Sequence, residues 1–131
     1  MNALFIYGTL MDDSLSFGLL GTALPKEPAV LQGFAKRRVQ DEAFPGIFAD
    51  DESEVRGQVM YNLTPEHFEV LDEYEGDYYL RTPVTVEAEG AGQIACFTYV
   101  FNPDYKHLLS NEEWTFQPLS DEYIHLMLHG S

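Results

Sequence analysis

An apolar stretch near the start of the chain, Ala3-Leu4-Phe5-Ile6-Tyr7-Gly8-Thr9-Leu10, predicts the first strand and the turn that leaves it. Its unbroken apolar part is typical of a strand that is buried on both faces. Gly8 has no side chain, so the backbone there can approach a ligand closely. The amides of Gly8, Thr9 and Leu10 could form an anion-binding concavity, although a glycine turn after a first strand is also common where nothing binds.

The rest of the chain predicts more strands and a few short helices. Runs rich in β-branched and aromatic residues predict strands at 30–35, 55–61, 79–86 and 93–100, the last two joined as a hairpin. Short helices are predicted at 12–20, 64–75 and 120–128. Pro25 and Pro28 indicate a connection, and Phe44-Pro45-Gly46-Ile47 indicates a turn. Five to six strands with short helices favour an α+β fold, a small mixed β-barrel with the helices packed outside. Residues 1–131 are long enough for a single domain with its own core.

The helix predicted at 64–75 ends on an acidic residue, Glu75, that falls on its apolar face. Thr64 supplies a hydroxyl N-cap, and Pro65 suits the first helical position. At about 100° per residue, Glu75 falls within the apolar face, between Leu71 and Phe68. The neighbouring acids of the helix fall on its polar face.

A carboxylate held against apolar neighbours has a raised pKa and can act as a general acid or base near neutral pH. The alternative is that Glu75, directly before the terminating Gly76, lies in a frayed last turn and is solvated. The spacing alone leaves both interpretations open.

The composition limits the kinds of partner that we expect. The 131 residues are 45% hydrophobic and 14% aromatic, which is typical of a globular chain, and the formal net charge of −15 repels nucleic acid and anionic membrane surfaces. The single cysteine, Cys96, allows no intrachain disulfide and favours a reducing compartment. The apolar run at 3–7 is too short for a signal peptide or a membrane span. We therefore expect a cytoplasmic protein without nucleic-acid or membrane partners; no oligomeric state follows.

Several motifs occur in an order that resembles the gamma-glutamylcyclotransferase-like family, in particular its small gamma-glutamylamine cyclotransferase branch. The matching motifs are Tyr7-Gly8-Thr9-Leu10, Gly33-Phe34, Phe44-Pro45-Gly46-Ile47, Val55-Arg56-Gly57-Gln58-Val59, the helix end from Leu71 to Gly76, Tyr79-Leu80-Arg81 and Phe97-Thr98-Tyr99-Val100. The resemblance covers residues 3–101. It implies a small β-barrel with flanking helices and a pocket between the first turn and Glu75.

The resemblance also implies a reaction. Members of the family release a γ-glutamyl group as 5-oxoproline and free an amine. The substrate's own α-amine attacks its γ-carbonyl, so the reaction needs a base but no protein nucleophile, metal or cofactor. Glu75 would be the catalytic acid and base. Substrate binding would fall to Tyr7, Gly8, Thr9 and Leu10.

Residues around this predicted pocket bear on what it binds. Tyr79 shares a strand face with Arg81 and could reach the pocket as a further substrate-binding residue; core packing is the alternative. Family members often carry basic or polar residues after Tyr-Gly-Thr-Leu, where this chain has Met11-Asp12-Asp13. Two acids beside the pocket mouth would disfavour anionic acceptor groups such as that of glutathione.

Two other functions stay open. The same pocket could capture a small carboxylate or a modified peptide end without turnover, as a binding module. An amide lyase or transferase could instead use Glu75 on another acylated amine. Turnover of a γ-glutamyl compound separates the first alternative from an enzyme.

Other candidate groups have simpler explanations. His125 and His129 have a helical spacing that can bind a metal, but no third ligand accompanies them, so we expect no metal site. Cys96 alternates with apolar residues in a predicted strand and is expected to be a core thiol. The basic cluster Lys36-Arg37-Arg38 could steer an anion, although balancing local carboxylates is the more ordinary role.

Overall fold

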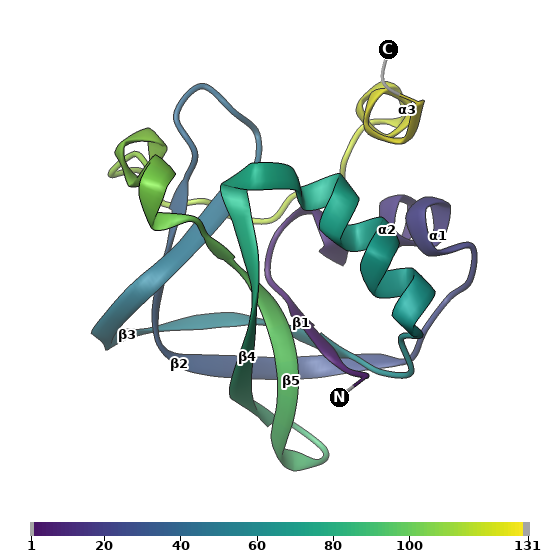
Figure 1. Ribbon diagram of the computed structural model, residues 1–131, viewed down its shortest axis with the longest axis horizontal. Helices are drawn as coiled ribbons and strands as arrows, with labels where there is room; N and C mark the ends of the chain where they lie inside the picture. Colours follow the sequence, from purple (N-terminus) through teal and green to yellow (C-terminus); the bar gives the residue numbers. More distant parts are fainter. Residues whose placement is uncertain (1, 130–131) are drawn as a thin grey trace.

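A five-stranded β-barrel forms the body of the molecule in the computed structural model, which describes residues 2–129 (Figure 1). The strands are β1 (Leu4–Ile6), β2 (Lys26–Arg38), β3 (Pro45–Met60), β4 (Tyr79–Ala88) and β5 (Gly92–Phe101). Their order around the closed barrel is β1-β3-β2-β4-β5. β1 pairs with β3 in the antiparallel sense and with β5 in the parallel sense, so the barrel is mixed. The predicted fold is confirmed.

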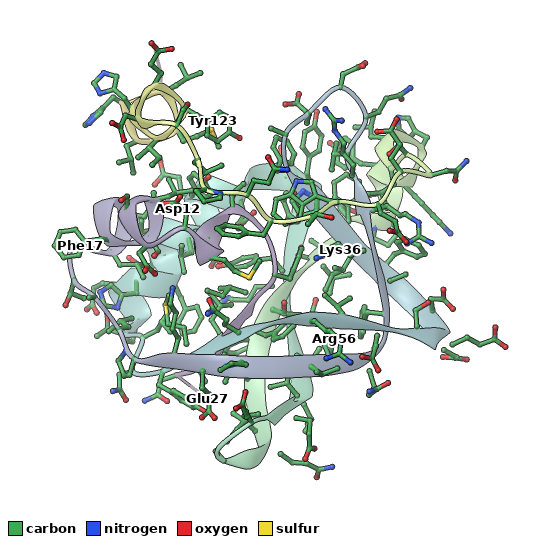
Figure 2. All side chains as sticks on the ribbon, turned by 180° about the vertical axis from the view of Figure 1, so that it is seen from behind. Asp12, Phe17, Glu27, Lys36, Arg56 and Tyr123 are labelled. Atoms are coloured by element: carbon green, nitrogen blue, oxygen red, sulfur yellow. The ribbon has the colours of Figure 1, made fainter. Side chains whose placement is uncertain are left out.

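Within the described residues, three helices lie outside the barrel: α1 (Asp13–Leu20), α2 (Pro65–Glu75) and α3 (Asp121–His129). Short 3-10 turns occur at η1 (Thr9–Met11), η2 (Gly76–Tyr78) and η3 (Pro103–Leu108). The α1 cap is Asp12, whose carboxylate accepts from the amides of Ser14 and Leu15 (Figure 2). The predicted Thr64 cap of α2 is confirmed, because its side chain accepts from the amide of His67. None of the helices in residues 2–129 is long and apolar enough to span a membrane.

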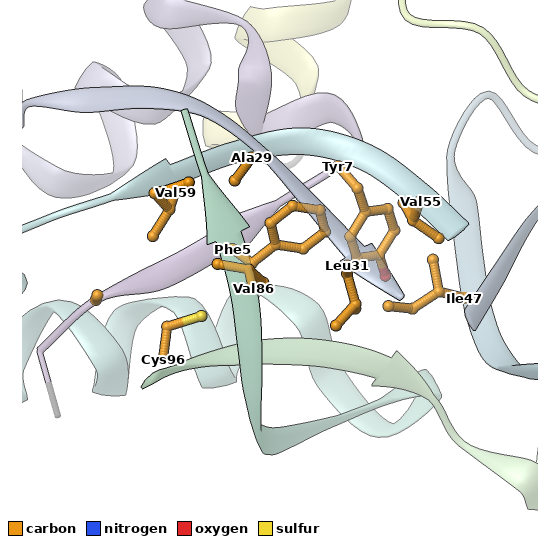
Figure 3. Close-up of a cluster of buried hydrophobic side chains, with 11 residues drawn as sticks. Phe5, Tyr7, Ala29, Leu31, Ile47, Val55, Val59, Val86 and Cys96 are labelled. Carbon is orange, nitrogen blue, oxygen red and sulfur yellow. The ribbon is translucent and has the colours of Figure 1, made fainter. Parts of the chain in front are cut away.

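β1 lies between two apolar clusters, which explains why its sequence is apolar throughout. Phe5 points into the barrel interior, where Val55 and Val59 also lie (Figure 3). Leu4 and Ile6 point the other way and pack in a second cluster that includes side chains of α2. Both faces of this strand are buried, as predicted, so the turn that leaves it starts from a fixed position.

The β2–β3 ribbon is longer than the sequence pattern predicted. β2 extends beyond 30–35 at both ends and includes Pro28, so the predicted connection at that residue is wrong. The turn predicted at 44–47 is also wrong, because β3 begins at Pro45, which pairs with Arg38. Proline is tolerated at the first residue of a strand, where a missing amide costs little. Gly33, with φ of 86°, lies at the irregularity where the pairing register shifts.

Gly57 lies where β3 passes close to β1. A Cβ added there would lie 2.2 Å from the carbonyl oxygen of Ile6 and 3.0 Å from the ring of Phe5. Backbone cannot yield easily at this point, since the neighbouring residues of both strands are paired with one another. We therefore expect Gly57→Ala to lower the free energy of unfolding by about 2–3 kcal/mol.

Urea unfolding checks this value. Arg56→Ala is the matched control, because the Arg56 side chain is 81% exposed and should change stability by less than about 0.5 kcal/mol. If Gly57→Ala were as stable as Arg56→Ala, the close approach of the two strands would be contradicted.

Candidate active site

A pocket of about 220 Å³ lies beside the end of β1. It is bounded by the turn after β1, the C-terminal end of α2 and the start of β3. Every residue predicted for the site lines it: Tyr7, Gly8, Thr9, Leu10, Glu75 and Tyr79. The fold thus brings together parts of the chain that are far apart in the sequence.

Glu75 is the last residue of α2 and lies on the helix face that the spacing predicted. Phe68 and Leu71 are buried on the same face and hold the helix against the barrel. The Glu75 side chain is half-buried, and this burial raises the pKa of its carboxyl from 4.5 to about 8. No ion pair forms between Glu75 and a basic side chain within residues 2–129. The group can therefore both take up and return a proton near neutral pH.

The turn after β1 presents backbone to the pocket. The first amide bonded within the turn is that of Met11, which donates to the carbonyl of Gly8 at 3.0 Å. The amides of Gly8, Thr9 and Leu10 therefore have no partner within the turn. Gly8 also faces Pro45, whose ring would lie 3.1 Å from an added Cβ. This turn can donate hydrogen bonds to an anionic oxygen of a bound molecule.

Tyrosine hydroxyls surround the Glu75 carboxyl. Burial raises the pKa of Tyr7, Tyr74, Tyr79 and Tyr99, and the nearby charge of Glu75 raises each of them further. The hydroxyls therefore stay protonated at neutral pH. Three of them donate to the protein: Tyr7 to the carbonyl of Tyr99 at 2.5 Å, Tyr79 to the carbonyl of Pro45 at 2.7 Å, and Tyr99 to Asp72 Oδ1 at 2.7 Å.

Comparison with known proteins shows the family of the chain. The family model described as gamma-glutamyl cyclotransferase, AIG2-like, matches residues 4–116. The chain belongs to this family. The match includes all the predicted site residues, and only α3 among the helices and strands lies beyond it. The resemblance found from the motifs is thereby confirmed.

Several relatives of the chain are AIG2-like proteins of Arabidopsis thaliana. AIG2-like protein C of Arabidopsis thaliana is 32% identical over 116 residues, which are 87% of this chain and 66% of the relative. The chain thus spans slightly less than two thirds of that protein. The solution structure of another Arabidopsis thaliana protein is 28% identical, with a TM-score of 0.73, over 95% of this chain and 81% of the other. A solved gamma-glutamyl cyclotransferase is 17% identical and shares the fold, with a TM-score of 0.72 over 99% of both chains.

Asp72 lies one helical turn before Glu75 and fixes the end of α2. Besides the bond from Tyr99, its Oδ1 atom lies 3.3 Å from Arg81 Nε on β4. The Arg81 guanidinium also lies over the rings of Phe68 and Phe97, at 4.7 and 4.8 Å from their centres. These contacts tie α2 to two strands and so hold Glu75 at the pocket. Asp72 belongs to the motif at the end of this helix, but no local pattern predicts this anchoring role.

Tyr74 differs from the other pocket tyrosines, because its buried hydroxyl has no hydrogen-bond partner. Thr9 lies close enough to oppose the rise in the pKa of Tyr74, but no hydrogen bond of normal geometry joins the two side chains. A buried polar group without a partner costs about 1–3 kcal/mol. We therefore expect Tyr74→Phe to leave the free energy of unfolding unchanged or to raise it by about 1 kcal/mol.

Thermal and urea unfolding check this expectation. Tyr61→Phe is the matched control outside the pocket, because the Tyr61 hydroxyl donates to Glu27 at 2.5 Å and its loss should lower stability slightly. A clear loss of stability in Tyr74→Phe, greater than in Tyr61→Phe, would mean that the Tyr74 hydroxyl has a partner after all.

Other predictions about the site meet different outcomes. The prediction that Asp12 and Asp13 flank the pocket mouth is wrong, since neither residue lines it: Asp12 caps α1, and Asp13 pairs with Lys26. His125 and His129 lie with their rings 4.6 Å apart, but no group of three potential metal ligands occurs within residues 2–129.

Cys96 and the basic cluster are placed as ordinary structural residues. Cys96 is fully buried in the barrel interior, and burial raises the pKa of its thiol to about 11. Lys36 lies over the ring of Trp114 at 5.2 Å from its centre, and Arg38 pairs with Glu112 at 3.5 Å. Neither basic residue lines the pocket.

Proposed function

We propose that this protein is a cofactor-independent cyclotransferase that releases 5-oxoproline and a free amine from γ-glutamyl amines or γ-glutamyl peptides. The observation that carries the proposal is the Glu75 carboxyl, with a pKa of about 8, in one pocket with the turn amides of Gly8, Thr9 and Leu10. Membership of the AIG2-like gamma-glutamyl cyclotransferase family supports the same reaction class.

In the proposed reaction Glu75 moves one proton twice. The ionised carboxyl takes a proton from the substrate's α-ammonium, and the freed nitrogen forms a bond to the γ-carbonyl carbon. The bond from that carbon to the acceptor nitrogen then breaks as Glu75 returns its proton to that nitrogen. The new ring nitrogen loses its second proton to the released amine, which leaves as an ammonium ion. Nothing is oxidised or reduced. With a pKa of about 8, roughly a tenth of the carboxyl is ionised at pH 7, and the protonated form is acidic enough to return its proton.

The remaining pocket groups hold and fold the substrate. No Lys, Arg or His is found among the described residues that line the pocket. The α-carboxylate, or the oxyanion that develops on the γ-carbonyl, would therefore be held by the amides of Gly8, Thr9 and Leu10. The hydroxyls of Tyr7 and Tyr79 already donate hydrogen bonds to backbone carbonyls. The rings of these two residues would therefore contact the folded γ-glutamyl chain. Holding the amine near the carbonyl supplies much of the rate by proximity.

A panel of γ-glutamyl amines, γ-glutamyl dipeptides and glutathione tests the proposal, with 5-oxoproline measured by mass. We expect release from the amines and slower release from glutathione. A carboxylate on the acceptor would be repelled by ionised Glu75 in the pocket and by Glu42, whose charge acts on the pocket residue Tyr79. No release from any member of the panel would refute the proposed activity and favour the binding module.

A further inference from the structure

The last helix of the described residues, α3, forms part of the pocket wall. Met127 of this helix lines the pocket together with Glu75 and the turn after β1. The helix lies at the outer edge of the molecule, beside α1 (Figure 1). It also lies beyond residues 4–116, which match the family model. The part of the pocket that Met127 forms therefore lies outside the residues that match the family model.

Two contacts fix where α3 lies. Asp12 Oδ2 accepts from the amide of Leu119 at 3.0 Å, while Oδ1 of the same carboxylate caps α1. In Figure 2 the chain passes beside Asp12 on its way to α3 and Tyr123. Leu128 packs on Gly18 of α1, where an added Cβ would lie 2.5 Å from its side chain. The hydrogen bond to Asp12 and the packing on α1 thus hold α3 in the position that places Met127 at the pocket.

The size of the pocket gives this wall a consequence. Its volume of about 220 Å³ is below the range of roughly 300–1,000 Å³ that is usual for small-molecule pockets. If the γ-glutamyl group lies against Glu75 and the turn, little space is left inside for the substituent on the acceptor amine. That substituent must pass along the outer wall. Methionine is unbranched and apolar, so it offers an adaptable surface for such a group.

We propose that Met127 is a specificity-determining residue, which contacts the substituent on the acceptor amine and limits its bulk. This inference rests on the proposed function, because the acceptor is defined by that reaction. The wall is continued by Phe44 and Pro45, and it favours small, uncharged, apolar substituents.

A pair of substrates that differ only in acceptor bulk tests the inference. The ratio of kcat/KM for γ-glutamyl-naphthylamide to that for γ-glutamyl-methylamide is measured in the full-length protein. Met127→Ala should raise this ratio about tenfold, since the removal of several side-chain atoms from the apolar wall enlarges the pocket. Met127→Trp should lower the ratio, because it makes the pocket smaller. Leu126→Ala is the matched control, because Leu126 is 49% exposed on the same helix and does not line the pocket. A ratio in Met127→Ala that stays within twofold of the control, or falls, overturns the inference.

A second experiment does not depend on turnover. Met127→Cys or Leu126→Cys is introduced together with Glu75→Gln, and alkylation by iodoacetamide is followed by mass. Cys96 is buried with a raised thiol pKa, so the introduced thiol is the one that reacts. We expect γ-glutamyl-naphthylamide to slow alkylation at position 127 at least fivefold and to leave position 126 unchanged. Equal rates with and without this compound at position 127 overturn the inference even if the parent protein is active. Protection in a protein that never releases 5-oxoproline would support the wall and refute only the proposed function.

Discussion

Glu75→Gln should lower the rate of 5-oxoproline release by about 100- to 10,000-fold, which is the usual contribution of a general acid or base. The amide has nearly the same shape as the carboxyl, but it cannot take a proton from the substrate's α-ammonium. The pocket and its turn amides stay in place, so the affinity for a γ-glutamyl amine should change by less than about threefold. Single-turnover rates and calorimetric binding on the same samples separate the two effects.

Two controls show whether such a loss is chemical. Glu73→Gln removes an exposed acid from the same helix and should keep full activity. Glu75→Gln should also be as stable as the parent at pH 8, or more stable. The sign follows from the raised pKa: the unfolded chain loses this proton near pH 4.5 and the folded protein only near pH 8, so ionisation weakens the folded state across that window. Retained activity in Glu75→Gln would contradict the proposed mechanism.

The rise of kcat/KM with pH is expected to extend to an unusually high pH for a carboxylate base. A base with a pKa of about 8 is ionised in roughly one molecule per thousand at pH 5 and in half of them at pH 8. The rate constant should therefore rise about tenfold per pH unit and level off above pH 8, a gain of several hundred-fold in total. Initial rates with γ-glutamyl-methylamide between pH 5 and 9 check this profile.

A solvated carboxylate would give a different curve. With a pKa near 4.5 it would be fully ionised by pH 6, and kcat/KM would no longer increase because of this group above that pH. The ionisation of the substrate's own amine can be measured separately by titrating the substrate alone. A flat profile between pH 6 and 8 would mean that burial does not control the proton transfer.

Much of the barrel could be predicted from the sequence, because its strands differ sharply from their surroundings. The apolar run of β1 and the alternation around Val55 and Val59 indicate burial directly. The full extent of β2 and β3 could not be predicted, since Pro28 and Pro45 resemble turn residues when read alone. Their strand conformation depends on pairing with distant residues, which outweighs local preference.

In the candidate site, too, some features could be predicted from local sequence and others could not. The inward position of Glu75 follows from helix spacing within a few residues, and the turn after β1 is a local feature. Asp12 lies at the start of the predicted helix, and this position indicates a helix cap more directly than a place at the pocket mouth. The contacts of Asp72 and Met127 depend on where strands and helices meet in space, so no local pattern reveals them.

Titration of the Glu75 carboxyl by carbon-detected NMR measures the property on which the proposed chemistry rests. Glutamate labelled at the side-chain carboxyl carbon gives a signal that Glu75→Gln identifies by its loss. We predict that this signal titrates with a midpoint near pH 8, well above the ordinary value of about 4.3 for a glutamate carboxyl. A midpoint for Glu75 at the ordinary value would contradict the account, because the group would then be open to water and unable to act as the proposed base and acid.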